Sequence, residues 1–299
     1  GNPLKQAVFH LPGLFEFYEL YRLFLPLFRE HREYFYDWCR IGSLYGAPGS
    51  CLWGGGRVGC EARDIQGPLA LCRAEGISAR LTFSNSLLEP RHLDDPASNA
   101  LCRQLNAREG NGVILHSELL LQYLQTHYPN LCRISSTTKV LTRWQDFLQE
   151  VDREAFSYVV PDFRLNKDFR HLETLTPGQR AKVEFLCNEC CDFGCTQRKS
   201  CYENVSRKNL GLPCRDHVCT APHGDEGYRF SRAMENPGFI SIQDIQETYL
   251  PMGFENFKLE GRGLGSAMVL EFLLYYLTKP QYQLHVREAI YLDSMLDLF

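Results

Sequence analysis

A short apolar run, a polar tip and a longer amphipathic stretch recur along the chain, and this repeat limits the possible folds more than any other feature. Strands that alternate with helices pair in parallel through right-handed crossovers. The expected strands span residues 7–10, 36–41, 79–83, 112–115, 131–134, 158–160, 182–186 and 256–259. The main expected helices span residues 14–31, 64–75, 97–106, 118–126, 143–151 and 266–278. Eight such units predict an α/β fold, a closed (β/α)8 TIM-type barrel, rather than an open doubly wound sheet. No strand-borne G-x-G-x-x-G fingerprint supports the second alternative.

We expect residues 1–299 to form a single barrel domain, with a Cys-containing insertion at 200–249 between the last two strands and a C-terminal helical extension at 279–299. The net charge of −4 and the pI near 6.2 argue against a broad nucleic-acid surface. No uncharged run reaches the roughly 18 residues that cross a bilayer. The apolar run at 11–28 lacks the basic head and cleavage site of a signal peptide. We therefore expect a cytoplasmic protein without membrane contact.

Polar side chains follow nearly every expected strand, where barrel enzymes build their active sites. The candidate site residues are His10, His116, Asn188, Glu189, Glu260 and Arg262. Arg262 with Glu260 either binds an anionic group through its guanidinium or forms an internal ion pair. We expect a polar substrate at this mouth, an anionic small molecule or a peptide.

The loop at 46–57 contains three consecutive glycines. Glycines leave backbone N–H groups free to face a ligand, with Trp53 as a stacking surface. The other interpretation is a flexible lid or a crowded turn.

The chain has 13 cysteines, an odd number in a sequence without an export signal, so a disulfide framework is not expected. Six are spread over the first half and are interpreted as small buried hydrophobes. The other seven fall between residues 187 and 219, and such a density of thiols predicts a soft metal or an iron–sulfur cluster. We expect Cys191, Cys195, Cys214 and Cys219 to bind a 4Fe-4S cluster, with Cys201, Cys190 and Cys187 as alternates. Zinc is the alternative metal, although only Cys187 and Cys190 have the C-x2-C spacing of a zinc ribbon.

At the eighth expected strand the chain reads Phe257-Lys258-Leu259-Glu260-Gly261-Arg262. This resembles the lysine/isoleucine–glutamate–glycine–arginine signature that ends the barrel of the collagenase-like peptidase family, U32. That family includes the RNA-hydroxylation and anaerobic ubiquinone-hydroxylation proteins, whose cysteines after the seventh strand bind a 4Fe-4S cluster. The resemblance covers residues 187–264 and implies an iron–sulfur barrel of this superfamily, in a branch with its own cysteine spacing.

Together these features predict an iron–sulfur enzyme of an anaerobic cytoplasm that carries out an oxygen-independent modification of the hydroxylation type. The alternative is a zinc-stabilised binding or assembly subunit, acting as a homo- or hetero-dimer through the amphipathic tail at 282–299. Proteolysis is a weaker hypothesis, because no H-E-x-x-H or G-x-S-x-G motif is present.

Overall fold

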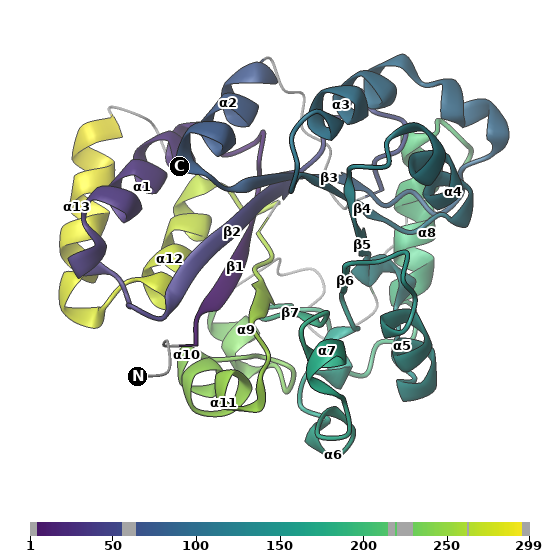
Figure 1. Cartoon of the computed structure of the whole chain (residues 1–299). Coiled ribbons are helices and arrows are strands. Elements are labelled where there is room, and N and C mark those ends of the chain that lie inside the picture. The colour runs from purple at the N-terminus through teal and green to yellow at the C-terminus, as the bar shows by residue number, and fades with distance from the viewer. Residues whose placement is uncertain (1–4, 56–63, 215–218, 220–229, 262, 295–299) are drawn as a thin grey trace.

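The computed structural model describes residues 5–55, 64–214, 219, 230–261 and 263–294, and it confirms the predicted (β/α)8 barrel (Figure 1). Its parallel strands run in the ring order β6-β5-β4-β3-β2-β1-β8-β7. They are β1 (Ala7–Pro12), β2 (Cys39–Gly46), β3 (Ser78–Phe83), β4 (Gly112–Leu115), β5 (Cys132–Ser135), β6 (Tyr158–Val159), β7 (Glu184–Leu186) and β8 (Asn256–Lys258). Because all strands are parallel, their carboxyl ends meet at one mouth.

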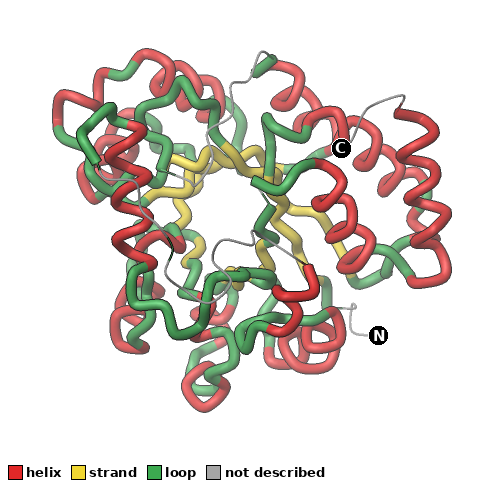
Figure 2. The backbone as a smooth tube through the Cα atoms, turned by 180° about the vertical axis from the view of Figure 1, so that it is seen from behind, coloured by secondary structure: helices red, strands yellow, loops and turns green. Residues whose placement is uncertain are grey.

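Helices surround the strands on the outside (Figure 2). The longer ones are α1 (Tyr18–Glu30), α2 (Gln66–Glu75), α3 (Pro96–Asn106), α4 (Glu118–His127), α5 (Trp144–Val151), α8 (Arg198–Asn209), α12 (Ser266–Leu277) and α13 (Gln283–Ser294). The shorter ones are α6 (Phe169–Leu172), α7 (Pro177–Arg180), α9 (Phe230–Glu235), α10 (Ile242–Asp244) and α11 (Leu250–Met252). The remaining turns are η1 (Arg32–Tyr34), η2 (Pro90–Asp94), η3 (Thr137–Lys139), η4 (Phe163–Leu165), the π-helical η5 (Ile245–Tyr249) and η6 (Pro280–Tyr282).

Local sequence explains where several helices begin. The Asp95 carboxylate accepts the Ser98 N–H at 3.1 Å and caps α3, which starts with Pro96. The Ser117 hydroxyl likewise accepts the Leu120 N–H at 3.2 Å and caps α4. Ser117 is therefore the N-cap residue of α4, in the short connection that follows β4.

The barrel closes through a narrow seam between β6 and β7. The two strands meet at a single parallel bridge, Val159 with Val183, in which the Val159 N–H donates to the Lys182 carbonyl at 2.8 Å. The β1–β2 pairing, by contrast, runs from Ala7 with Cys39 to Pro12 with Tyr45.

Two predicted boundaries were wrong because contacts distant in sequence override the local pattern. The second strand was expected at 36–41, but it spans Cys39–Gly46. The Tyr36 N–H is bonded instead to the Leu277 carbonyl at 2.9 Å, which attaches this segment to the end of α12. The first helix was expected from residue 14, but α1 starts at Tyr18, because the Leu14 N–H donates to the Tyr45 carbonyl at 3.0 Å.

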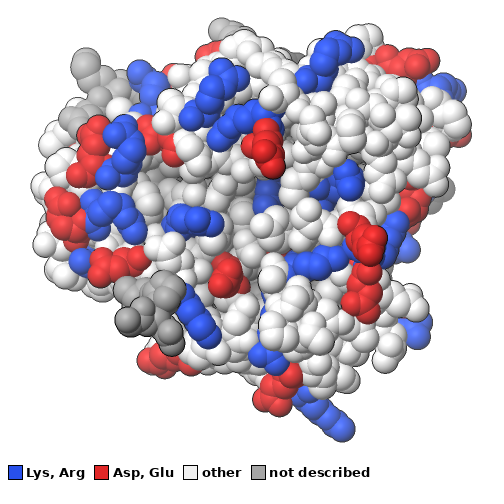
Figure 3. Space-filling view, viewed as in Figure 1, with Lys and Arg blue, Asp and Glu red and all other residues white. Residues whose placement is uncertain are grey.

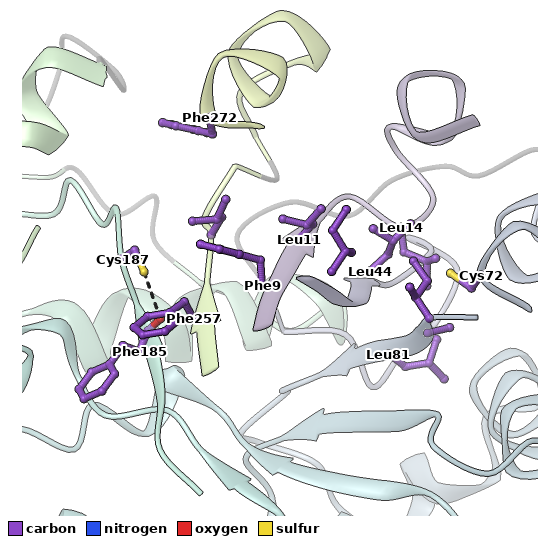
Figure 4. Close-up of a cluster of buried hydrophobic side chains, with 14 of the residues drawn as sticks. Phe9, Leu11, Leu14, Leu44, Cys72, Leu81, Phe185, Cys187, Phe257 and Phe272 are labelled. Carbon is purple, nitrogen blue, oxygen red and sulfur yellow. Dashed lines mark hydrogen bonds between the residues drawn. The ribbon is translucent and has the colours of Figure 1, made fainter. Parts of the chain in front are cut away.

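Apolar side chains pack on both sides of the barrel wall. The outward layer includes Phe9, Leu11, Leu44, Leu81, Phe185 and Phe257, packed under the helices (Figure 4). A second cluster contains Tyr45, Ile114, Ile134, Val160 and Leu186, which come from five different strand segments and so fill the barrel interior. Burial of both layers supplies the main favourable free energy of folding.

None of the helices in the described ranges is long and apolar enough to cross a bilayer. On the face shown in Figure 3, Lys and Arg side chains alternate with Asp and Glu, without a continuous basic surface on that face.

Candidate active site

The mouth of the barrel carries most of the predicted site residues. His116 follows β4, Asn188 and Glu189 follow β7, and Glu260 follows β8. Asn188 joins the last two tips, because its Nδ2 donates to the Glu260 carbonyl at 3.0 Å and its Oδ1 accepts the Glu260 N–H at 2.7 Å. These contacts give Asn188 a positioning role in the structure. Arg262 lies outside the described residues.

His116 is partly exposed at the mouth and is held as a neutral imidazole. Burial, and then the charges of Lys139 and Lys199, lower its pKa to about 4. Its Nδ1 lies 2.9 Å from Thr138 Oγ1, and the Thr138 hydroxyl donates to Ser136 Oγ at 2.9 Å. Because the Thr138 hydroxyl hydrogen is used in the bond to Ser136, Thr138 Oγ1 accepts a hydrogen bond from the His116 Nδ1–H. The other ring nitrogen, Nε2, is then unprotonated and carries the lone pair.

Three buried hydroxyls on this side of the barrel, those of Thr82, Ser84 and Thr137, have no hydrogen-bond partner within the described residues. Arg80 reaches across the barrel to Glu184, so the alternate positions 82 and 84 of the same strand also point inward. A buried hydroxyl without a partner costs about 1–3 kcal/mol. Each of these oxygens therefore has a hydrogen-bonding capacity that water or another polar group can fill.

Glu189 takes part in a buried ionic network between the tips of β6 and β7. The Arg198 guanidinium, 1% exposed, contacts Asp162 Oδ2 through Nε at 3.2 Å and Glu189 Oε2 through Nη2 at 3.2 Å. Arg164 binds the other Asp162 oxygen at 2.7 Å. Arg198 was not among the predicted site residues. Its signal in the sequence is the polar repeat of Arg198, Tyr202 and Ser206, which form the buried side of α8.

α8 reaches from this network toward the tips of β2 and β3 and also packs against η3, next to His116. The Asn85 Nδ2 donates to the Ser206 carbonyl at 3.2 Å, and the Asn209 Nδ2 donates to the Gly54 carbonyl at 2.7 Å. The described part of the glycine-rich loop, residues 46–55, is therefore tied to α8. Trp53 is fully buried and donates to the His92 carbonyl at 2.8 Å, so it is a core residue and offers no stacking surface.

His10 lies deeper, inside the barrel, and not beside the other predicted site residues. Along β7, Glu184 is on the N-terminal side of Leu186 and Asn188 is on the mouth side, so the inner apolar cluster separates the two regions. His10 Nδ1 lies 2.6 Å from Ser43 Oγ, and its Nε2 lies 3.0 Å from Asn256 Oδ1 and 3.3 Å from Glu184 Oε1. Burial, and then the charge of Arg80, lower the His10 pKa to about 4.

These contacts connect the Ser43 hydroxyl, the His10 imidazole and the Glu184 carboxylate in the same order as the residues of a serine catalytic triad. Ser43 is fully buried, however, and the inner apolar cluster separates it from the mouth. Burial alone would raise the pKa of Glu184, but His10, Arg80 and Lys258 together hold it at about 2. The cluster is best described as a charged layer that organises the lower half of the barrel. Charged residues at inward positions of the strands were its signal in the sequence.

The cysteine-rich segment begins at the tip of β7. Cys187 is fully buried, and burial raises the pKa of its thiol well above the usual range, so it is protonated and apolar in character. The N–H groups of Cys190 and Cys191 donate to Glu189 Oε1 at 3.1 and 3.0 Å, and Arg164 Nη1 donates to the Cys195 carbonyl. Cys201 is partly buried on α8, Cys214 is partly buried, and Cys219 is exposed.

Thiolates suit a soft metal chemically. Among the described residues, no three His, Cys, Asp or Glu side chains are grouped so as to hold an ion. The predicted ligand set of Cys191, Cys195, Cys214 and Cys219 stays a prediction.

Comparison with solved structures shows one clear similarity. The U32 peptidase Mk0906 superposes with a TM-score of 0.53 over 87% of this chain and 95% of that chain, at 13% sequence identity. No protein-family model matches the chain, and no curated protein matches it in sequence. The chain therefore shares the barrel fold of that U32 peptidase.

Proposed function

We propose that this protein is an enzyme that uses acid–base chemistry on a polar substrate bound at the carboxyl end of the barrel. The observation that carries the proposal is His116, a neutral imidazole at the mouth whose Nδ1 is held by Thr138 and whose pKa is lowered to about 4. The buried hydroxyls of Thr82 and Ser84 are the polar groups that a substrate would satisfy. Binding at this end of a barrel is the general rule for such enzymes.

In this proposal the side chains have separate roles. His116 Nε2 accepts a proton from the substrate or from an attacking water. Thr138 is a positioning residue, because its hydroxyl fixes the tautomer that leaves Nε2 unprotonated. Burial lowers the His116 pKa most, and the charges of Lys139 and of Lys199 on α8 lower it further, so the imidazole is neutral before the reaction.

The tautomer is directly measurable. Long-range 1H–15N spectra of the free enzyme should show His116 protonated at Nδ1, with a titration midpoint near 4. Thr138→Val, which removes the acceptor but keeps the shape, should shift the proton toward Nε2, and Thr138→Ser should preserve the wild-type pattern. An unchanged tautomer in Thr138→Val would contradict the positioning role.

Peptide hydrolysis is one reaction that the proposed enzyme would catalyse. Because the fold neighbour is a U32 peptidase, hydrolysis of a synthetic peptide library, read by mass spectrometry, is one assay for the enzyme. His116→Asn, which keeps a hydrogen bond to Thr138 but removes the base, should slow turnover by roughly 10²–10⁴-fold. A loss below about threefold would show that His116 is not the base.

The second candidate function is the oxygen-independent, iron–sulfur-dependent modification predicted from the cysteines and from the U32-like signature at residues 257–262. Protein purified anaerobically from iron-replete cells should then contain iron and sulfide, and Cys191→Ser or Cys195→Ser should lose both. Cys72→Ser and Cys102→Ser are the matched controls, since both thiols are buried in the core. Zinc without iron or sulfide would support the zinc-stabilised binding subunit instead.

A further inference from the structure

α8 docks on the barrel mouth in a different way from the other long helices. Its buried side chains are Arg198, Tyr202 and Ser206, and its sequence contains no Leu, Ile, Met or Phe. α12, by comparison, buries Val269, Leu270, Phe272, Leu273 and Leu274. A helix held by polar contacts over little apolar area is easily displaced, because those contacts can be exchanged for water or for a ligand.

The guanidinium of Arg198 lies in a cage of two carboxylates and two aromatic rings. Asp162 and Glu189 contact two different nitrogens, each at 3.2 Å, and the carbon of the guanidinium lies 5.0 Å from the Phe163 ring centre. Tyr202 of α8 supplies a second ring at 5.2 Å. The Nη2–Glu189 contact is a hydrogen bond and the Nε–Asp162 contact is an ion pair, and two carboxylates on separate nitrogens suit a planar guanidinium better than an ammonium group. Aromatic faces add cation–π attraction.

Apart from the Tyr202 ring, the groups that surround the guanidinium come from outside α8 and are held there by other contacts. Arg164 holds Asp162 in place through a 2.7 Å contact. The N–H groups of Cys190 and Cys191 hold Glu189. Phe163 packs edge-on against Phe193, with ring centres 6.0 Å apart. Both carboxylates and the ring would therefore remain in position if α8 moved away.

We propose that Asp162, Glu189 and Phe163 form a binding site for the guanidinium group of a substrate, and that Arg198 occupies this site while no substrate is bound. α8 then acts as a lid: a guanidinium ligand displaces Arg198 and exposes the mouth. This inference deepens the proposed function, because it names the substrate class for the mouth that holds His116.

Binding of Nα-acetyl-arginine methylamide, measured by calorimetry, tests the proposal without any turnover. Arg198→Ala should bind this probe at least tenfold more tightly than the wild type, because no internal arginine competes. Glu189→Gln added to Arg198→Ala should weaken the binding at least tenfold. The citrulline analogue, which has the same shape without the charge, should not bind. Equal binding of the arginine and citrulline probes, or no gain in Arg198→Ala, would overturn the proposal.

Arg207→Ala is the matched control on the same helix, because Arg207 is partly exposed and contacts Glu203 only at 4.0 Å. It should bind the probe as the wild type does. If Arg198→Ala does not fold, Arg198→Lys provides the same test, since its ammonium cannot make both contacts and should give a smaller gain in affinity.

Hydrogen exchange of the wild type supplies a second readout. A saturating concentration of the arginine probe should speed amide exchange at residues 198–209 and leave β1 and β2 unchanged. No change at 198–209 would contradict the lid. Because neither measurement uses activity, loss of the His116 proposal would leave these outcomes intact, and failure here would leave the His116 tests standing.

Discussion

At the scale of single residues, His10 is the clearest case of burial overriding the ordinary chemistry of a side chain. Its pKa falls from 6.5 to about 4, so the unfolded chain binds more protons than the folded one between these two pH values. The contribution of the neutral His10 to the free energy of unfolding is therefore fully present above pH 6.5. It is lost as the pH falls toward 4, by about 3 kcal/mol in total. Urea unfolding between pH 7 and 4 should show this loss, to which His116 adds in the same direction. A His10 NMR midpoint near 6.5 would contradict the burial argument.

Gly42 is a second residue whose role depends on its surroundings. The β1–β2 register shifts between Phe9 and His10, and this irregularity turns Ser43 toward His10. A Cβ at Gly42 would lie 2.4 Å from Val8 Cγ1 and 3.0 Å from His10 Cε1. We expect Gly42→Ala to lower the free energy of unfolding by about 1–3 kcal/mol through overpacking. Gly178→Ala is the control, because its Cβ meets only Thr176 Oγ1 at 4.0 Å, and it should be neutral.

At the scale of elements, one buried amide links three segments that are far apart in the sequence. Asn85 donates to the carbonyls of Gly54 and Ser206, each at 3.2 Å, and accepts the Leu87 N–H at 2.9 Å. Asn85→Ala should remove these three hydrogen bonds, including the one that the Leu87 N–H makes, and cost about 1–3 kcal/mol. Exchange of the amides at 51–55 and 198–209 should rise together, which native-state hydrogen exchange would detect. Asn130→Ala, at an exposed loop, should change stability by less than about 0.5 kcal/mol.

At the scale of the whole molecule, the seam between β6 and β7 is the weak point of the barrel. One bridge closes it, whereas every residue of β1 from Ala7 to Pro12 pairs with β2. We therefore expect the Val159 amide to exchange faster than the Leu44 amide under native conditions, because sheet opening starts where fewest hydrogen bonds must break. Similar protection of both amides would show that the barrel opens as one unit.

The sequence alone determined the barrel and the side of it that carries polar groups. Alternating apolar runs and amphipathic stretches are local patterns, and they predict a parallel sheet whose tips meet at one mouth. For this reason the pattern of residues is enough to assign His116, Asn188, Glu189 and Glu260 to the mouth. The density of thiols after β7 also comes from the sequence, and its interpretation as a metal site remains a prediction.

Only the tertiary structure decided which polar side chains form hydrogen bonds and ion pairs with one another. His10 meets Asn256 across 246 positions, and Arg80 meets Glu184 across 104, so no local pattern predicts these pairs. The inner apolar cluster separates His10 from the mouth, and α8 brings Arg198 to Asp162 and Glu189. Periodicity reports which face of an element is buried, but partner choice depends on how the elements pack, and that is set by the folded barrel as a whole.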